Sequence, residues 1–145
     1  MARSDRTLEG TPTAPLPEGC RRGRILSIDA PERLRPIPLA RRIPVRIRND
    51  SECRWPGVGI RSEGLVGLDY RWISPSGVAS PILDPISQLL TDVAPQAEIE
   101  AAVVVQPPAG GPGTWTLEVR LRQEGEAQPI ASIERPVEIV GPPHG

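Results

Sequence analysis

The residues that could carry chemistry are few in this chain of 145 residues, and their types exclude several reactions. The only histidine is His144, next to the last residue, where we expect solvent around it. There is no lysine, because all 17 basic residues are arginines. The chain therefore lacks the parts of a histidine-based triad, a Schiff base or a P-loop phosphate site. We expect a protein that is not an enzyme and that uses no cofactor.

The two cysteines, Cys20 and Cys53, do not have the spacing of a metal site. Structural zinc sites use pairs of ligands a few residues apart, and these two are far apart and stand alone. A single pair also does not make a framework of disulfides. We expect two free thiols in a reducing compartment, with Cys20 in a mobile N-terminal segment.

Carboxylates could form a catalytic acid–base pair, and clustered glycines could form a phosphate-binding loop. Asp69, Glu98, Glu100 and Glu118 occupy the polar positions of alternating segments, so we expect them to point to solvent and to pair with arginines. A catalytic pair of carboxylates would need a cleft and a raised pKa. Glycines cluster at 57–59 and 110–113, but no helix follows either cluster, which favours turns over phosphate-binding loops.

The arginines suggest an anion-binding patch as an alternative. Patches that bind nucleic acid usually add aromatic side chains that stack on bases, whereas here the aromatic residues occupy inward positions. Opposite charges on neighbouring strands explain the arginines without a ligand. We expect Arg46 and Arg48 beside Glu98 and Glu100, and Arg120 and Arg122 beside Asp69, Glu134 and Glu138, with no binding of nucleic acid. The arginines of the alternative patch are residues 21, 22, 24, 41, 42, 46, 48 and 54.

The elements that would position these residues are strands. Large apolar residues alternate with small or polar ones in VGLDYRWI, residues 66–73, which predicts a strand that we place at the centre of the fold. Similar alternation predicts a first strand with Leu26 and Ile28 inward, whereas the proline-rich segment 30–42 is an edge or a crossing. We expect Trp55, Tyr70, Trp72 and Trp115 to form an aromatic core. The predicted strands are 24–29, 43–50, 66–73, 86–90, 97–106, 114–123 and 133–140.

About seven short strands with proline- and glycine-rich turns predict an all-β fold, an antiparallel β-sandwich of the immunoglobulin or fibronectin type III kind. We expect a mobile N-terminal arm over 1–23, the β-sandwich domain over 24–141 and a tail over 142–145. The N-terminus has no apolar stretch like that of a signal peptide, and no segment approaches the roughly 20 apolar residues of a membrane span. The expected location is the cytoplasm, with no membrane span.

Several motifs occur in order between residues 43 and 125: NDSECRWPG, GLDYRWISPSG, LTDVAPQAEIEAAVVVQPPAGG and PGTWTLEVRLRQEG. This stretch resembles a bacterial immunoglobulin-like accessory domain, of the kind fused to glycosyltransferases or methyltransferases of cell-envelope polysaccharide synthesis. It is distantly similar to the four-tryptophan domain of autophagy receptors. Three departures stand out: Gln96 replaces the usual glycine, Trp115 replaces the usual tyrosine, and no Trp-Phe pair follows QEG.

The resemblance implies a non-catalytic binding or accessory module whose partner is a protein or a glycan. The binding residues stay unknown at this point. The alternative is a structural or assembly module that docks an enzyme or another protein through a sheet face or edge. Both rest on analogy of fold, which does not by itself give a function.

Overall fold

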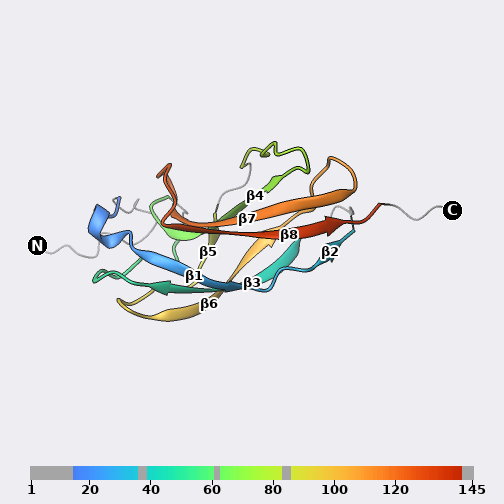
Figure 1. The fold of residues 1–145 in the computed structure, drawn as a ribbon. Helices are drawn as coiled ribbons and strands as arrows, with labels where there is room; N and C mark the ends of the chain where they lie inside the picture. Colours follow the sequence, from blue (N-terminus) through green and yellow to red (C-terminus); the bar gives the residue numbers. More distant parts are fainter. Residues whose placement is uncertain (1–14, 36–38, 61–62, 83–85, 142–145) are drawn as a thin grey trace, which may run out of the picture.

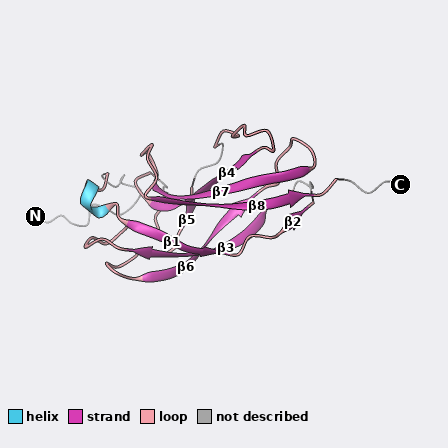
Figure 2. Ribbon diagram, viewed as in Figure 1, coloured by secondary structure: helices cyan, strands magenta, loops and turns pink. Residues whose placement is uncertain are grey.

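The computed structural model describes residues 15–35, 39–60, 63–82 and 86–141. Apart from a three-residue 3-10 helix, η2 (Glu18–Cys20), the regular elements of these residues are strands (Figure 2). The prediction of an all-β fold is confirmed. The strands are β1 (Gly23–Ile28), β2 (Arg33–Leu34), β3 (Arg41–Asn49), β4 (Val66–Ile73), β5 (Ser87–Gln88), β6 (Glu98–Val105), β7 (Gly113–Gln123) and β8 (Ala131–Ile139).

The strands form two sheets that lie one above the other in Figure 1. One sheet has the order β1-β3-β6, and the other has the order β2-β8-β7-β4-β5. The chain crosses between the sheets after β1, so that β2 pairs with β8 and not with its neighbours in the sequence. This pair is parallel, whereas the other strand pairs are antiparallel. The expectation of a purely antiparallel arrangement is therefore wrong at β2, and the proline-rich segment is a crossing.

The strand at the middle of the larger sheet is β7, with β8 on one side and β4 on the other. The sequence placed β4 there, and this placement is wrong. On the other side of β4, β5 pairs through two residues, and Ile73 forms an isolated bridge with Ala79. Alternation along a strand shows which face is buried, but it does not show how many neighbours the strand has. The middle of this edge, residues 69–71, therefore has no partner strand among the described residues.

The core lies between the two sheets and is made of the inward rows that period-two alternation predicts. Trp55, Trp72 and Trp115 are buried in it, as expected, whereas Tyr70 is half-buried at its margin. In β1 the register shifts between Ile25 and Ser27. Because a bulge changes which side chains point inward, Ile25 and Ile28 pack against the core, and not Leu26 and Ile28 as predicted.

The two ends of the molecule differ, and each is defined here by a residue of β3. At one end β3 finishes with Asn49, close to Cys20, Cys53 and Trp55; we call it the disulfide end. At the other end β3 begins with Arg41, opposite Val105 of β6, and β2 finishes near Val140; we call it the arginine end. In Figure 1 the first lies at the left and the second at the right.

Candidate functional site

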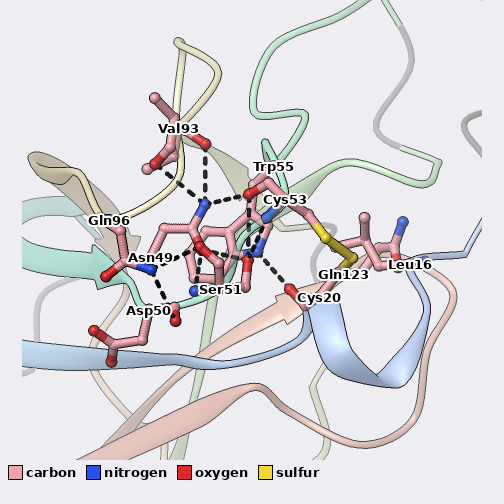
Figure 3. Close-up of a disulfide and its surroundings, with 11 residues drawn as sticks. Leu16, Cys20, Asn49, Asp50, Ser51, Cys53, Trp55, Val93, Gln96 and Gln123 are labelled. Atoms are coloured by element: carbon pink, nitrogen blue, oxygen red, sulfur yellow. Dashed lines mark hydrogen bonds between the residues drawn. A yellow bond between two sulfur atoms is a disulfide. The ribbon is translucent and has the colours of Figure 1, made fainter.

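The disulfide end is held together by a bond between Cys20 and Cys53 (Figure 3). The prediction of free thiols is therefore wrong. The two Cα atoms are 5.4 Å apart, a usual distance for a disulfide. The described part of the expected arm is also attached to the domain, since the Leu16 amide donates to the Gln123 side chain at 2.8 Å. The domain thus includes residues before 24, and residues 1–14 lie outside the described ones.

Asn49 is the polar centre of this end, and its side chain is fully buried. Its Nδ2 donates to the carbonyls of Cys53 at 2.8 Å and Val93 at 3.1 Å, and its Oδ1 accepts from Ser51. The indole of Trp55 donates to the Cys20 carbonyl at 2.7 Å. These bonds join three loops and leave the polar groups of Asn49 satisfied, which identifies a structural network and not a ligand site.

Gln96 closes the same network from an unusual backbone conformation. Its φ is +65°, in the region that favours glycine, which the resembled family usually has at this position. The Gln96 side chain donates to the Ser51 carbonyl at 3.0 Å and the Asp50 carbonyl at 3.3 Å. These hydrogen bonds offset the strain of a non-glycine residue here, so the departure from the family pattern has a physical reason.

Asp50, on the surface of the disulfide end, is held by two arginines. Arg24 Nε donates to its carboxylate at 2.8 Å and Arg48 Nε at 2.7 Å. The hydrogen bond from Arg24 is the main cause that lowers the pKa of Asp50 from its ordinary value, and the bond from Arg48 adds to it. The same interaction raises the pKa of Arg24. The charge of Asp50 is thus balanced by Arg24 and Arg48.

A cleft of about 680 Å³ is lined by residues 68–72 of β4, by the segment 80–82, and by Val104 of β6 and the loop that follows it. Its lining includes the half-buried Tyr70, the exposed Gln106, and Val104, whose exposed fraction is 45%. Pro107 and Pro108 form part of the wall, and the buried Trp72 and Trp115 lie behind it. A mainly apolar hollow with a few polar groups is the usual form of a small-ligand site.

The wall of this cleft, residues 106–111, is fixed by the three aromatic side chains. Trp72 Nε1 donates to the Gln106 carbonyl at 2.7 Å, and the Tyr70 hydroxyl accepts from the Gln106 amide at 3.0 Å. Trp115 Nε1 donates to the Gly111 carbonyl at 3.0 Å. A Cβ on Gly110 would lie 2.7 Å from the Trp115 ring, so only glycine allows this close approach. The cleft is therefore formed before any ligand arrives.

Two carboxylates near the cleft are already engaged. Asp69 is only 3% exposed and accepts bonds from Arg120 at 3.0 Å and from Arg122. Glu118, 9% exposed, accepts a bond from Arg71. The expectation that Asp69 and Glu118 point to solvent is wrong. They lie on the outward face, as their register predicts, but neighbouring side chains cover them. Their pairing with arginines is as predicted.

The charge ladder predicted on the smaller sheet is confirmed in part. Glu98 lies 3.9 Å from Arg46 and 3.7 Å from Arg48, and Glu98 and Glu100 are both exposed. On the larger sheet, Arg120 and Arg122 contact Asp69 as predicted, whereas Glu138 pairs with Arg33. Most arginines of the suggested basic patch that lie near the disulfide end therefore have acidic partners.

Three arginines surround a second hollow of about 660 Å³ at the arginine end: Arg33, Arg35 and Arg41. Leu34, Leu39 and Val140 line it as well. The anion-binding patch suggested from the sequence includes Arg41 but neither Arg33 nor Arg35. Their common feature is their position beside the crossing between β1 and β3, and only the path of that crossing brings them together.

The described residues contain neither a metal-binding cluster nor a membrane-spanning helix. Within them, no group of three or more histidine, cysteine or acidic side chains is placed to hold a metal ion. Over the same residues, no helix has the length and apolar character that crossing a bilayer requires. His144 lies outside the described residues. The described residues thus form two hollows, one lined by aromatic side chains and the other by arginines.

In comparisons with known proteins, the chain matches no family model and no curated protein. The resemblance to an accessory domain of envelope polysaccharide enzymes therefore stays an expectation from the motifs.

Proposed function

We propose that this protein is a non-catalytic β-sandwich of the immunoglobulin or fibronectin type III kind that binds a glycan in the cleft between β4 and β6. The strand order supports the fold assignment, because sandwiches of this class place their first, second and fifth strands in one sheet. If the two-residue β2 is set aside as a crossing, these strands are β1, β3 and β6, which form the smaller sheet.

The cleft is the observation that carries the proposal. Its wall is preorganised because Trp72 and Trp115 donate hydrogen bonds to it and the Tyr70 hydroxyl accepts one from it, so little conformational entropy is lost when a ligand binds. Tyr70 and Val104 offer apolar surface for the C–H face of a sugar ring. The Gln106 side chain offers a donor and an acceptor for hydroxyl groups, and no other residue uses them in the part of the chain that the structure describes.

The absence of a catalytic role is part of the proposal. The carboxylates nearest the cleft, Asp69 and Glu118, are engaged by arginines, whereas a glycosidase needs two carboxyl groups free to act on the glycosidic bond. The motifs shared with accessory domains of envelope polysaccharide enzymes suggest the biological setting. The chain would then present a glycan to a partner enzyme.

The expected cytoplasmic location stays a prediction, and the disulfide argues against it. Disulfides persist in oxidising compartments and are rare where thiols are kept reduced. The bond between Cys20 and Cys53 favours a location outside the reducing cytoplasm, with the module acting where the glycan is assembled or displayed.

The test is a titration of the protein with neutral and acidic oligosaccharides, followed by calorimetry or by NMR shifts. Gln106→Ala should weaken binding about twofold to tenfold, because one hydrogen bond is worth roughly 0.5–1.5 kcal/mol. The matched control is Gln128→Ala, an exposed glutamine in the loop between β7 and β8 at the disulfide end. Equal affinities of the two variants, or no binding of any glycan, would contradict the proposal.

The second candidate is an assembly module that docks a protein. The observation that favours it is a set of exposed aliphatic side chains, Val58, Ile60 and Leu90. Two of the loops that carry them are joined, since the Leu90 amide donates to the Gly57 carbonyl at 2.9 Å. A protein partner whose binding is lost in Val58→Ser/Leu90→Ser but kept in Gln106→Ala would favour this candidate.

A further inference from the structure

The described lining of the hollow at the arginine end contains three arginines and no acidic residue. Arg33, Arg35 and Arg41 line it, and the one carboxylate paired there is Glu138, 3.4 Å from Arg33. Neither Arg35 nor Arg41 has an acidic partner among the described residues. Two guanidinium groups beside one concave surface therefore have no ion-pair partner in the part of the chain that the structure describes.

The position of Arg41 explains why its charge is available. In β3 the inward row is Ile43, Val45 and Ile47, and Arg41 continues that row at the point where the core ends. A guanidinium in this place lies over the open end of the two sheets, beside Leu34 and Val140 of the opposite sheet. Its stem can contact apolar surface while its head stays in solvent.

The arginine hollow and the aromatic cleft are neighbours. Pro107 lines both of them, so the two hollows meet at the beginning of the loop that follows β6. This loop is the wall fixed by Tyr70 and Trp72 through Gln106. An extended ligand can therefore lie across Pro107 with one part in each hollow, and the distance between the parts is held constant by the protein.

We propose that Arg35 and Arg41 bind a carboxylate or phosphate group, and that the ligand of the joined groove is an acidic glycan. Guanidinium groups suit this role because their planar donors match both anions in a two-bond geometry. The apolar side chains Leu34, Leu39 and Val140 around the arginines exclude water in part and strengthen such contacts. The inference rests on the proposed function for its glycan part, whereas the anion site stands on the arginines alone.

The experiment compares two oligosaccharides with the same linkage, a β-1,4-linked hexamer of glucuronic acid and cellohexaose. The full chain should bind the acidic hexamer at least tenfold more tightly than the neutral one at low salt. In Arg35→Gln/Arg41→Gln this preference should disappear while the affinity for cellohexaose stays the same. Because both arginines are exposed, the melting temperature should not change. The matched control is Arg22→Gln/Arg54→Gln, two exposed arginines before β1 and after β3, which should keep the preference.

Small anions identify the bound group and separate the two proposals. Competition by sodium glucuronate supports a carboxylate ligand, and stronger competition by inorganic phosphate supports a phosphorylated one. Equal binding of both hexamers by the wild-type protein would overturn the acidic glycan and leave the glycan cleft standing. Binding of phosphate without either hexamer would keep the anion site and overturn the proposed function. Loss of the preference in the control variant would overturn the site itself, as would tight, salt-sensitive binding of mixed-sequence DNA that depends on Arg35 and Arg41.

Discussion

The two ends of the molecule use similar residues for different purposes. Each end has a buried tryptophan whose indole donates to a loop carbonyl, Trp55 to Cys20 and Trp115 to Gly111. In each case a glycine allows the ring to approach the backbone, Gly23 at Trp55 and Gly110 at Trp115.

The difference between the ends lies in the polar groups. At the disulfide end Asn49, Gln96 and Asp50 bond within the protein, and a covalent bond joins the segments. At the arginine end the side chains of Gln106, Arg35 and Arg41 lie beside hollows without partners in the described chain. Satisfied polar groups stabilise a fold, whereas open ones beside a rigid wall are available to a ligand. The disulfide end should therefore respond to substitution mainly in stability, and the arginine end mainly in binding.

The largest expected effect is at Trp55, whose side chain is fully buried. Trp55→Ala should lower the free energy of unfolding by about 3–5 kcal/mol, because it empties a large site in the core. Urea unfolding followed by circular dichroism measures this. Val58→Ala, in the same loop but exposed, should change stability by less than about 0.5 kcal/mol. A small change in the free energy of unfolding for Trp55→Ala would show that the disulfide end does not stabilise the fold as expected.

The disulfide comes next. Cys20→Ala/Cys53→Ala should lower the free energy of unfolding by about 2–4 kcal/mol, because the unfolded chain loses a cross-link. Dithiothreitol should destabilise the wild-type protein by a similar amount and leave the variant unchanged. A titration that finds two free thiols in the native protein would remove the basis for the comparison and restore the cytoplasmic prediction.

A smaller effect is expected at Tyr70, at the margin of the cleft. Tyr70→Phe removes the acceptor of the Gln106 amide and should cost about 0.5–1.5 kcal/mol. Its clearer sign should be faster hydrogen exchange at Gln106, with little change at Gly111, whose carbonyl is held by Trp115. If the Gln106 amide hydrogen exchanges at the same rate in the wild-type protein and in Tyr70→Phe, the wall of the cleft is not held in place by Tyr70.

The smallest expected effect is on the pH dependence of stability, to which Asp50 contributes. Its pKa in the folded protein is lower than the ordinary 3.8, mainly because Arg24 donates to its carboxylate. The stabilisation of the folded protein by the ion pairs of Asp50 is therefore complete above about pH 3.8, the ordinary pKa of the carboxyl group. It is lost as the pH falls through the lower pKa that Asp50 has in the folded protein. Asp50→Asn should reduce the loss of stability below pH 3.8, measured by urea unfolding at several pH values. The exposed Asp29, changed to Asn, should leave the profile as it is.

The alternation of apolar and polar residues was enough to predict most of the strands and, except in β1, the faces that they bury. The residues of β4 were predicted with the observed bounds, and Trp72 of β4 and Trp115 of β7 are buried in the core as predicted. This succeeds because side chains alternate strictly along a strand, so that hydrophobic pattern alone shows the buried face. The pairing of Arg46 and Arg48 with an acidic neighbour on β6 followed from the same register.

Other features arise where segments that are distant in the sequence meet, and only the folded structure reveals them. Cys20 and Cys53 form a bond because the segment before β1 lies against the loop after β3, and spacing carries no signal of that approach. Asp69 is buried because two arginines of β7 lie over it, although its position in the strand is an outward one. Arg35 and Arg41 share a hollow because the chain crosses between sheets. In each case the physical reason is that local pattern fixes the direction of a side chain, whereas its surroundings come from chain segments that only the folded structure brings together.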